Sequence, residues 1–193
     1  NLGLAYERDG RAEDALRELE HGLRLKPDSA EAWNTVGSLR KSHGDLNGAE
    51  KAYRTALTYS SSFPGIYYNL GNLRQRSGDL DEAVQYFESA LELDAHFVLA
   101  RNNLGQAFEA AQRYEAAAQQ YELAVRDSLY WKDVRDPELG GAWFNLAGVR
   151  ERLGDMNGAR VGFIRARDLL EGHEDYAGFS TRAAAAADRL TRE

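Results

Sequence analysis

The sequence predicts an all-α protein in which one pair of helices is repeated along the chain. A Leu-Gly dipeptide, or a close variant of it, recurs once in each unit. Leu2, Val36, Leu70 and Leu104 follow one another at a constant step, and Leu146 follows after the same step with a short insertion. A repeat of about 34 residues is typical of architectures in which each unit supplies two helices. Such units stack on one another because a single helix pair cannot bury its apolar face alone.

Each unit contains the pattern of two amphipathic helices joined by a turn. Apolar residues fall at i, i+3, i+4 and i+7 in both halves, so each half predicts a helix with one apolar face. Most units then have a glycine, which can end the first helix in the left-handed conformation. These glycines are Gly10, Gly44, Gly78 and Gly154, and Gln112 stands at the same place in the fourth unit.

An aspartate follows three of these glycines and predicts the N-cap of the second helix, at Asp45, Asp79 and Asp155. Glu82 lies at i+3 from Asp79, so these two residues predict a capping box. Gly48 lies inside a second helix, where glycine costs about 1 kcal/mol relative to alanine. The same is true of Gly158, and nothing in the sequence explains either glycine.

Further positions are occupied by similar residues in every unit. With Leu-Gly as positions 7 and 8, position 4 holds Trp33, Tyr67, Arg101 and Trp143, and position 24 holds Leu19, Tyr53, Phe87, Tyr121 and Phe163. Position 20 is always alanine, and position 27 is Gly22 and then alanine. The chain therefore resembles the tetratricopeptide repeat family, whose unit has Trp, Leu-Gly, Tyr, Ala, Phe, Ala and Pro at fixed offsets. The resemblance implies a right-handed superhelical solenoid of five tandem helix-turn-helix repeats.

The chain divides into these repeats and a C-terminal helix. The repeats are expected at about residues 1–29, 30–63, 64–97, 98–131 and 140–173, with an insertion at 132–139. Residues 174–193 lack the Leu-Gly signature and predict a C-terminal capping helix, with Phe179, Ala183, Ala186 and Leu190 on its apolar face and Arg182, Arg189 and Arg192 away from it. The chain begins inside a first helix. We therefore expect either a preceding segment in a longer protein or an uncapped N-terminal end that is open to self-association.

The resemblance implies that the first helices line a concave groove. Position 6 faces this groove in the family and is occupied by Asn1, Thr35, Asn69, Asn103 and Asn145. An amide can donate to a peptide carbonyl and accept from a peptide N–H, so a row of them can hold an extended peptide. The row is similar to the asparagine ladder of O-linked N-acetylglucosamine transferase. The ladder is broken at Thr35. We expect Asn69, Asn103 and Asn145 to be largely free of the core, although they could instead satisfy only local polar groups.

The candidate peptide-binding residues extend beyond this row, because neighbouring groove positions are also neutral polar or aromatic. The full set is Asn34, Tyr68, Asn69, Asn72, Asn102, Asn103, Gln106, Phe144 and Asn145. Charged residues at the rim of the groove are interpreted as solvated, namely Arg76, Glu109, Glu151 and Arg152. In the segment after the fourth repeat, Tyr130 and Trp131 form a candidate partner loop, or else pack against the ridge between repeats. Pro137 and Gly140 mark that segment as a loop or a bent helix extension.

Composition and spacing exclude several classes of function. The net charge of −7 argues against a nucleic-acid partner. The chain has no cysteine, and its four histidines lack a metal-ligand spacing, so we expect no metal, no cofactor and no catalytic site. No apolar run is long enough to span a membrane. Chaperone-binding members of the family hold a terminal carboxylate with cations, but Tyr68, Gly141 and Asn145 stand at those positions, which excludes that clamp.

The sequence thus favours a non-catalytic protein–protein interaction scaffold that binds an extended peptide or a partner helix in its concave groove. One alternative is the substrate-presenting segment of a larger enzyme, such as a glycosyltransferase. Another is a self-assembling structural scaffold. The identity of the protein or peptide partner and the compartment, cytoplasmic or periplasmic, are left open at this stage.

Overall fold

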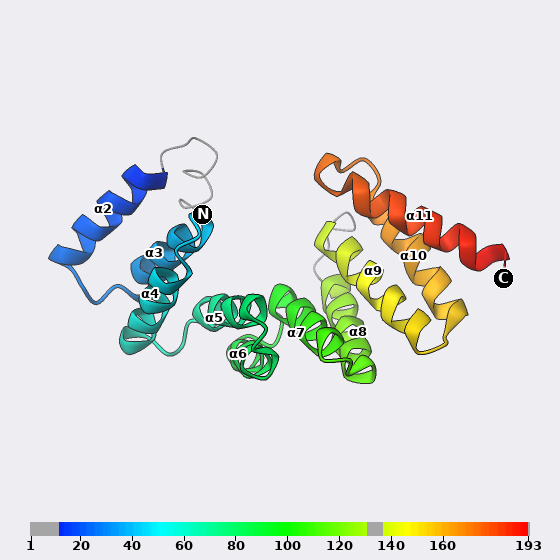
Figure 1. The fold of residues 1–193 in the computed structure, drawn as a ribbon, viewed down its shortest axis with the longest axis horizontal. Coiled ribbons are helices and arrows are strands. Elements are labelled where there is room, and N and C mark those ends of the chain that lie inside the picture. Colours follow the sequence, from blue (N-terminus) through cyan, green and yellow to red (C-terminus); the bar gives the residue numbers. More distant parts are fainter. Residues whose placement is uncertain (1–11, 131–136, 193) are drawn as a thin grey trace. The chain divides into compact units, whose positions relative to one another are not determined.

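The computed structural model describes residues 12–130 and 137–192, and this part of the chain consists of helices and the turns between them, without a strand. The all-α fold class is thus confirmed (Figure 1). The helices are α2 (Ala12–Leu25), α3 (Ala30–Ser42), α4 (Leu46–Tyr59), α5 (Pro64–Ser77), α6 (Leu80–Leu93), α7 (Val98–Ala110), α8 (Tyr114–Tyr130), α9 (Pro137–Arg152), α10 (Met156–Leu170) and α11 (Ala177–Arg192). A 3₁₀ turn, Glu174–Tyr176, precedes α11. The first helix expected of the first repeat, with Asn1 and Gly10, lies outside the described residues.

The helices belong to two compact units, which divide between Asp94 and Ala95 and are described separately. In the first unit α2 packs on α3, α3 on α4, α4 on α5 and α5 on α6. In the second unit α7 packs on α8, α8 on α9, α9 on α10 and α10 on α11. Each unit is therefore a stack of helices in chain order, as expected of helical repeats.

The turn between first and second helices has the same backbone geometry in both units. Gly44, Gly78 and Gly154 have φ values of 82°, 87° and 84°. After α3, the N–H of Asp45 donates to the carbonyl of Arg40 at 2.9 Å, and that of Gly44 donates to Lys41 at 3.1 Å. This pair of bonds is the Schellman arrangement, which satisfies carbonyls at a helix end. Left-handed backbone is therefore required at the glycine position.

Gln112 adopts this left-handed conformation without being glycine. Its φ is 59°, and among the described residues no other non-glycine residue has a positive φ. The N–H of Arg113 donates to Phe108 at 2.8 Å, and that of Gln112 donates to Glu109 at 2.9 Å. The fourth turn thus has the Schellman bonds of the others, although a Cβ atom is strained there.

The N-caps explain the two glycines inside second helices. Asp45 accepts a hydrogen bond from the N–H of Gly48, and Asp155 from that of Gly158, both at 2.8 Å. A Cβ atom on either glycine would overlap the Oδ2 of its capping aspartate. A residue with a Cβ at the third helical position would therefore require the capping side chain to shift.

The capping box expected at Asp79 is wrong, because Asp79 makes no side-chain cap bond. Its Oδ2 instead accepts from Ser77 Oγ at 2.7 Å. Glu82 pairs with Arg74 Nε at 2.9 Å rather than reaching back to the cap. Arg74 also pairs with Glu50, so a cation between helices has attracted the acid that the local pattern assigned to the cap.

Glycine at position 8 allows an aromatic ring of the second helix to reach the backbone of the first. A Cβ atom on Gly37 would overlap the ring of Tyr53, and one on Gly71 would lie 2.6 Å from Phe87. Tyr53 and Phe87 are both fully buried. The last helix pair differs, because Ala147 stands at position 8 and faces Gly162 of α10, whose added Cβ would lie 2.8 Å from it. In this pair the glycine that permits close approach of the two helices lies on the second helix.

Helix α11 completes the core of the second unit. Ala183, Ala187 and Leu190 are buried in one cluster with residues of α9 and α10, as expected of a capping helix. Two of its arginines are exposed but still contact neighbouring residues. Arg182 lies over aromatic rings of α9 and α11, and Arg189 pairs with Glu151 of α9 at 2.6 Å.

Helices α8 and α9 lie directly on either side of residues 131–136, and α9 extends into the expected insertion. Helix α8 extends to Tyr130, and Pro137, Gly140 and Gly141 lie in α9, so the described residues at both ends of this segment are helical. Only the backbone of Tyr130 is described, and Trp131 lies outside the described residues, so the role of this pair stays a prediction.

Candidate functional site

Asparagine pairs link neighbouring first helices in both units. In the first unit Asn69 of α5 donates from Nδ2 to Oδ1 of Asn34 on α3, at 3.0 Å. In the second unit Asn145 of α9 donates to Asn102 of α7, at 3.2 Å. All four side chains are half-buried. Each pair joins position 6 of one first helix to position 5 of the first helix before it, so the contact has the same register in both units.

Asn69 and Asn145, expected to be largely free of the core, are thus half-buried and bond to a neighbouring amide. Asn69 also accepts from Lys41 Nζ at 3.3 Å. A primary amide has two N–H donors and two acceptor lone pairs, so one or two bonds do not exhaust it. The paired amides therefore hold adjacent helices together and still have hydrogen-bonding capacity for a ligand.

The same register recurs between α9 and α11 with aromatic residues. Phe179 follows Asn145 by one repeat length, at the equivalent of position 6, and Phe144 is at position 5. Their ring centroids are 5.5 Å apart at 89°, an edge-to-face arrangement. Phe144 also contacts Phe163 of α10 at 5.5 Å. The Arg182 guanidinium lies 5.1 Å from the Phe144 ring centroid and 5.6 Å from that of Phe179.

A pocket of about 430 Å³ lies between α2 and α3, and a second hollow of about 610 Å³ lies in the second unit. The second contains two of the candidate residues, Phe144 and Asn145. Residues from α7, α9, α10 and α11 line it, among them Met156, Phe163, Phe179 and Arg182. It therefore brings together an amide, aromatic rings and cations from α9, α10 and α11 with an acid, Glu109, from α7.

The charged residues beside this hollow form ion pairs between helices, contrary to the interpretation that they are only solvated. Arg152 of α9 contacts Glu109 of α7 at 2.6 Å, and Glu151 is paired with Arg189. The hydroxyl of Tyr121 donates to Glu109 at 3.1 Å. Burial, followed by the negative charge of Glu109, raises the pKa of Tyr121 above its ordinary value.

The other candidate residues also lie on first helices and are half-buried. They are Tyr68 and Asn72 on α5, and Asn103 and Gln106 on α7. The Tyr68 ring contacts Phe87, with centroids 6.1 Å apart. Within the described part of the chain, no group of three or more His, Asp or Glu side chains is placed to hold a metal ion. None of the described helices is both long and apolar enough to cross a bilayer.

Family models match two overlapping stretches of the chain. One described as "Tetratricopeptide repeat" matches residues 68–134, and one described as "TPR repeat" matches residues 37–78. The chain belongs to the tetratricopeptide repeat (TPR) family. No curated protein matches it.

Solved structures of TPR proteins have a similar fold. PilF of Pseudomonas aeruginosa has a TM-score of 0.75 and 20% identity, with 99% of this chain and 89% of that one covered. YrrB, described as a TPR protein with an unusual peptide-binding site, has a TM-score of 0.68 and 18% identity over 96% and 89%. The chaperone SycD of Yersinia enterocolitica, in complex with a peptide of the translocator YopD, has 0.58 and 21% over 65% and 90%. At these identities the likeness shows the fold.

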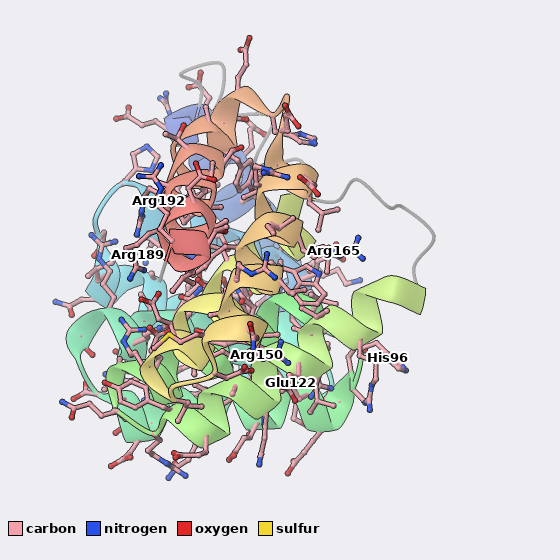
Figure 2. All side chains as sticks on the ribbon, turned by 90° about the vertical axis from the view of Figure 1, so that its right-hand side faces the viewer. His96, Glu122, Arg150, Arg165, Arg189 and Arg192 are labelled. Carbon is pink, nitrogen blue, oxygen red and sulfur yellow. The ribbon has the colours of Figure 1, made fainter. Side chains whose placement is uncertain are left out.

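The TPR register also reveals contacts that the sequence analysis missed. Position 11 is arginine in three repeats, and each arginine pairs with a glutamate of the preceding second helix. The pairs are Arg40–Glu20 at 2.8 Å, Arg74–Glu50, and Arg150–Glu122 at 2.8 Å (Figure 2). Recurrence of arginine at one position was the available signal. For Phe179 and Arg182 the signal was the repeat step from Asn145, which continues past the last Leu-Gly motif.

Proposed function

We propose that this TPR protein is a non-catalytic scaffold that binds an extended peptide or a partner helix along its first helices. The observation that carries the proposal is the register of the asparagine pairs, Asn34–Asn69 and Asn102–Asn145. Each pair presents half-buried amides at equivalent places of successive first helices. Such amides suit a ligand whose own hydrogen-bonding groups repeat, which is the case for a peptide backbone.

The amide pairs are suited to binding because their geometry is already set. Each bond between two amides restrains both side chains, so less conformational entropy is lost when a ligand binds. YrrB is described as having an unusual peptide-binding site, and SycD forms a complex with a peptide, so proteins of similar fold support the proposal by analogy.

The test uses a partner captured by the full chain and narrowed to a peptide by mapping. Replacing Asn69, Asn103 and Asn145 together by alanine should weaken its binding about a hundredfold, because each lost hydrogen bond contributes on the order of 1 kcal/mol. Calorimetric titration measures the change. The melting temperature should fall modestly, since two of the amides also join helices.

The matched control replaces Asn47 and Asn157, which are exposed on the second helices α4 and α10. This variant should bind as wild type does. Unchanged affinity in the folded triple variant would contradict the proposal and would direct attention to the convex face or to the segment after α8.

A further inference from the structure

We infer that the 610 Å³ pocket of the second unit is a subsite for an extended peptide that carries an acidic side chain two positions from a large apolar one. The inference rests on the proposed function and gives it a ligand chemistry. It depends on the charge balance of the pocket, on the contacts of Arg182, and on the exposed apolar surface beside that arginine.

The four charged residues that line the pocket sum to zero, but Arg189, which lies outside the lining, pairs with Glu151 and leaves Arg182 without an opposing charge among them. Glu109 is paired with Arg152, and Glu151 with Arg189, both at 2.6 Å. These pairs cancel one another's charges. For Arg182, the structure shows contacts with aromatic rings in place of a carboxylate. The pocket therefore complements a ligand with a negative charge.

Arg182 is held by the rings in a way that suits a carboxylate. Its guanidinium carbon lies 5.1 Å and 5.6 Å from the ring centroids of Phe144 and Phe179. The attraction between a guanidinium and a ring does not occupy the guanidinium's N–H donors, which lie at its edge. Those edge donors match the two oxygens of a carboxylate, and such charge-assisted bonds are stronger than neutral ones.

Two large apolar side chains that line the pocket with Arg182 are exposed to solvent. Met156 is 47% exposed and Phe179 is 41% exposed, and both line the pocket together with the buried Phe163. Covering these side chains with an apolar group would remove their surface from water, which favours binding. Because an acidic group and an apolar group are both needed, a purely acidic or purely apolar ligand fits less well.

The spacing of the two ligand groups follows from the geometry of an extended chain. Residues i and i+2 project to the same face and lie about 7 Å apart. The guanidinium carbon of Arg182 is 5.6 Å from the Phe179 ring centroid, so one peptide face can reach both. Asn145 lines the same pocket, and its amide can contact the backbone between the two side chains.

The experiment uses the full chain and two synthetic peptides, acetylated and amidated at their ends. They differ only in carrying aspartate or asparagine two positions before a phenylalanine. We expect wild type to bind the aspartate peptide about tenfold more tightly in a calorimetric or NMR titration, because a charge-assisted bond is lost with asparagine. Added salt should reduce this preference.

The variant Arg182→Gln should bind both peptides alike, since it removes the charge but keeps a long polar side chain. Arg192→Gln is the matched control, because Arg192 is exposed on the same helix and outside the pocket lining. It should keep the tenfold preference. Met156→Asp should weaken binding of both peptides, and because Met156 is exposed the variant should fold, which a thermal melt checks.

Equal binding of the two peptides to wild type, or an equal effect of Arg182→Gln and Arg192→Gln, would overturn the inference. So would tight binding of an asparagine peptide with a free C-terminal carboxylate, which would assign the pocket to chain ends. Displacement of the peptide by AMP at a similar concentration would assign it to small aromatic anions instead.

Failure of this subsite is distinguishable from failure of the proposed function. If binding of the captured partner requires Asn69 and Asn103, but the wild type does not prefer the aspartate peptide, the proposed function holds and the subsite is wrong. An aspartate preference that depends on Arg182, together with a partner indifferent to the asparagines, would give the opposite result.

Discussion

The two units join their first helices at the same pair of positions, but with different chemistry. In the first unit an amide pair connects α3 and α5, and Lys41 adds a further bond to it. The second unit has an amide pair between α7 and α9 and then an aromatic pair, Phe144 and Phe179, between α9 and α11. In each of these three contacts, position 5 of one helix and position 6 of the next hold residues of the same type. The residue types at these contacts can therefore differ while the helices keep the same arrangement in chain order.

The cores of the units differ in a similar, compensated way. Gly71 gives space to Phe87 in the first unit, whereas Ala147 in the second unit faces Gly162 on the opposite helix. In both cases one small residue permits the close approach of the two helices. If the two arrangements are equivalent, comparable substitutions in the two units should change the free energy of unfolding by similar amounts.

The largest effect is expected from removing α11, which distinguishes the second unit. Truncation after Gly172 would remove the buried Ala183, Ala187 and Leu190 and expose the surface of Phe163 and Phe144. We expect a loss of several kcal/mol in the free energy of unfolding, because each buried apolar side chain contributes about 1–3 kcal/mol. Urea denaturation and a sizing column measure the loss and any association.

Truncation after Leu190 is the control for this experiment, because Thr191 and Arg192 are exposed. It should leave stability and monodispersity nearly unchanged. If both truncated chains behave alike, α11 does not stabilise the second unit.

A smaller loss is expected from Gly71→Ala in the first unit. The added Cβ would lie 2.6 Å from Phe87, which is fully buried. The variant should therefore lose about 1–3 kcal/mol of unfolding free energy. Gly22→Ala is the control, because nothing lies within 4 Å of its Cβ and alanine is the better helix former. Chemical denaturation compares the two.

The second unit should respond to Gly162→Ala in the same way, since its added Cβ would lie 2.8 Å from Ala147. Combining it with Ala147→Gly should recover part of the loss. A double variant that is no more stable than Gly162→Ala alone would show that the two arrangements are not equivalent.

Tyr53 and Phe87 occupy the same position in successive repeats. The variant Tyr53→Phe therefore measures what the hydroxyl of Tyr53 contributes to stability. Burial raises the pKa of Tyr53 to about 12 from 10.0, and Tyr53 lies 3.2 Å from Ser38 Oγ. Because the folded pKa exceeds the unfolded one, the stabilisation is present below pH 10 and is lost as the pH rises from 10 to 12. The loss is roughly 2–3 kcal/mol for this group.

The Tyr53→Phe variant should therefore lose less stability than wild type between pH 10 and pH 12, while losing about 1 kcal/mol at neutral pH with the hydrogen bond. Denaturation curves at several pH values measure both. Parallel alkaline loss in the two proteins would show that Tyr53 does not titrate with folding.

The smallest effect is expected at the turn that differs between units. Gln112 has φ 59°, where a Cβ atom is strained, so Gln112→Gly should stabilise by about 1 kcal/mol. Gly78→Gln in the first unit is the reciprocal change and should destabilise by a similar amount. A melting temperature that falls in Gln112→Gly would mean that the Gln112 side chain contributes more than the strain costs.

The sequence was sufficient for features that depend on local spacing. The helices, their left-handed ends and the buried residues of position 24 follow from periodicity and from glycine chemistry. Features that depend on contacts between repeats were predicted poorly. Glu82 was assigned to a cap because the competing Arg74 lies on another helix, and its attraction is invisible in the local pattern.

The candidate site shows the same limit. Asn69 and Asn34 were both identified, but not as partners, because their contact depends on how adjacent repeats are aligned. The contact of Arg182 with Phe144 was not predicted, because Phe144 lies on another helix and a helical wheel of α11 alone does not include it. Counting one repeat length on from Asn145 would have located Phe179 beside this site.

The coupling of positions 5 and 6 has a consequence for anyone who recombines TPR modules. A repeat cut at its usual boundaries carries its own position 6 but separates it from the position 5 that it touches. Moving the repeat that contains Asn145 next to a neighbour with phenylalanine at position 5 would set an amide against a ring. A transferable cassette would therefore run from position 6 of one repeat to position 5 of the next, so that grafts keep each matched pair intact.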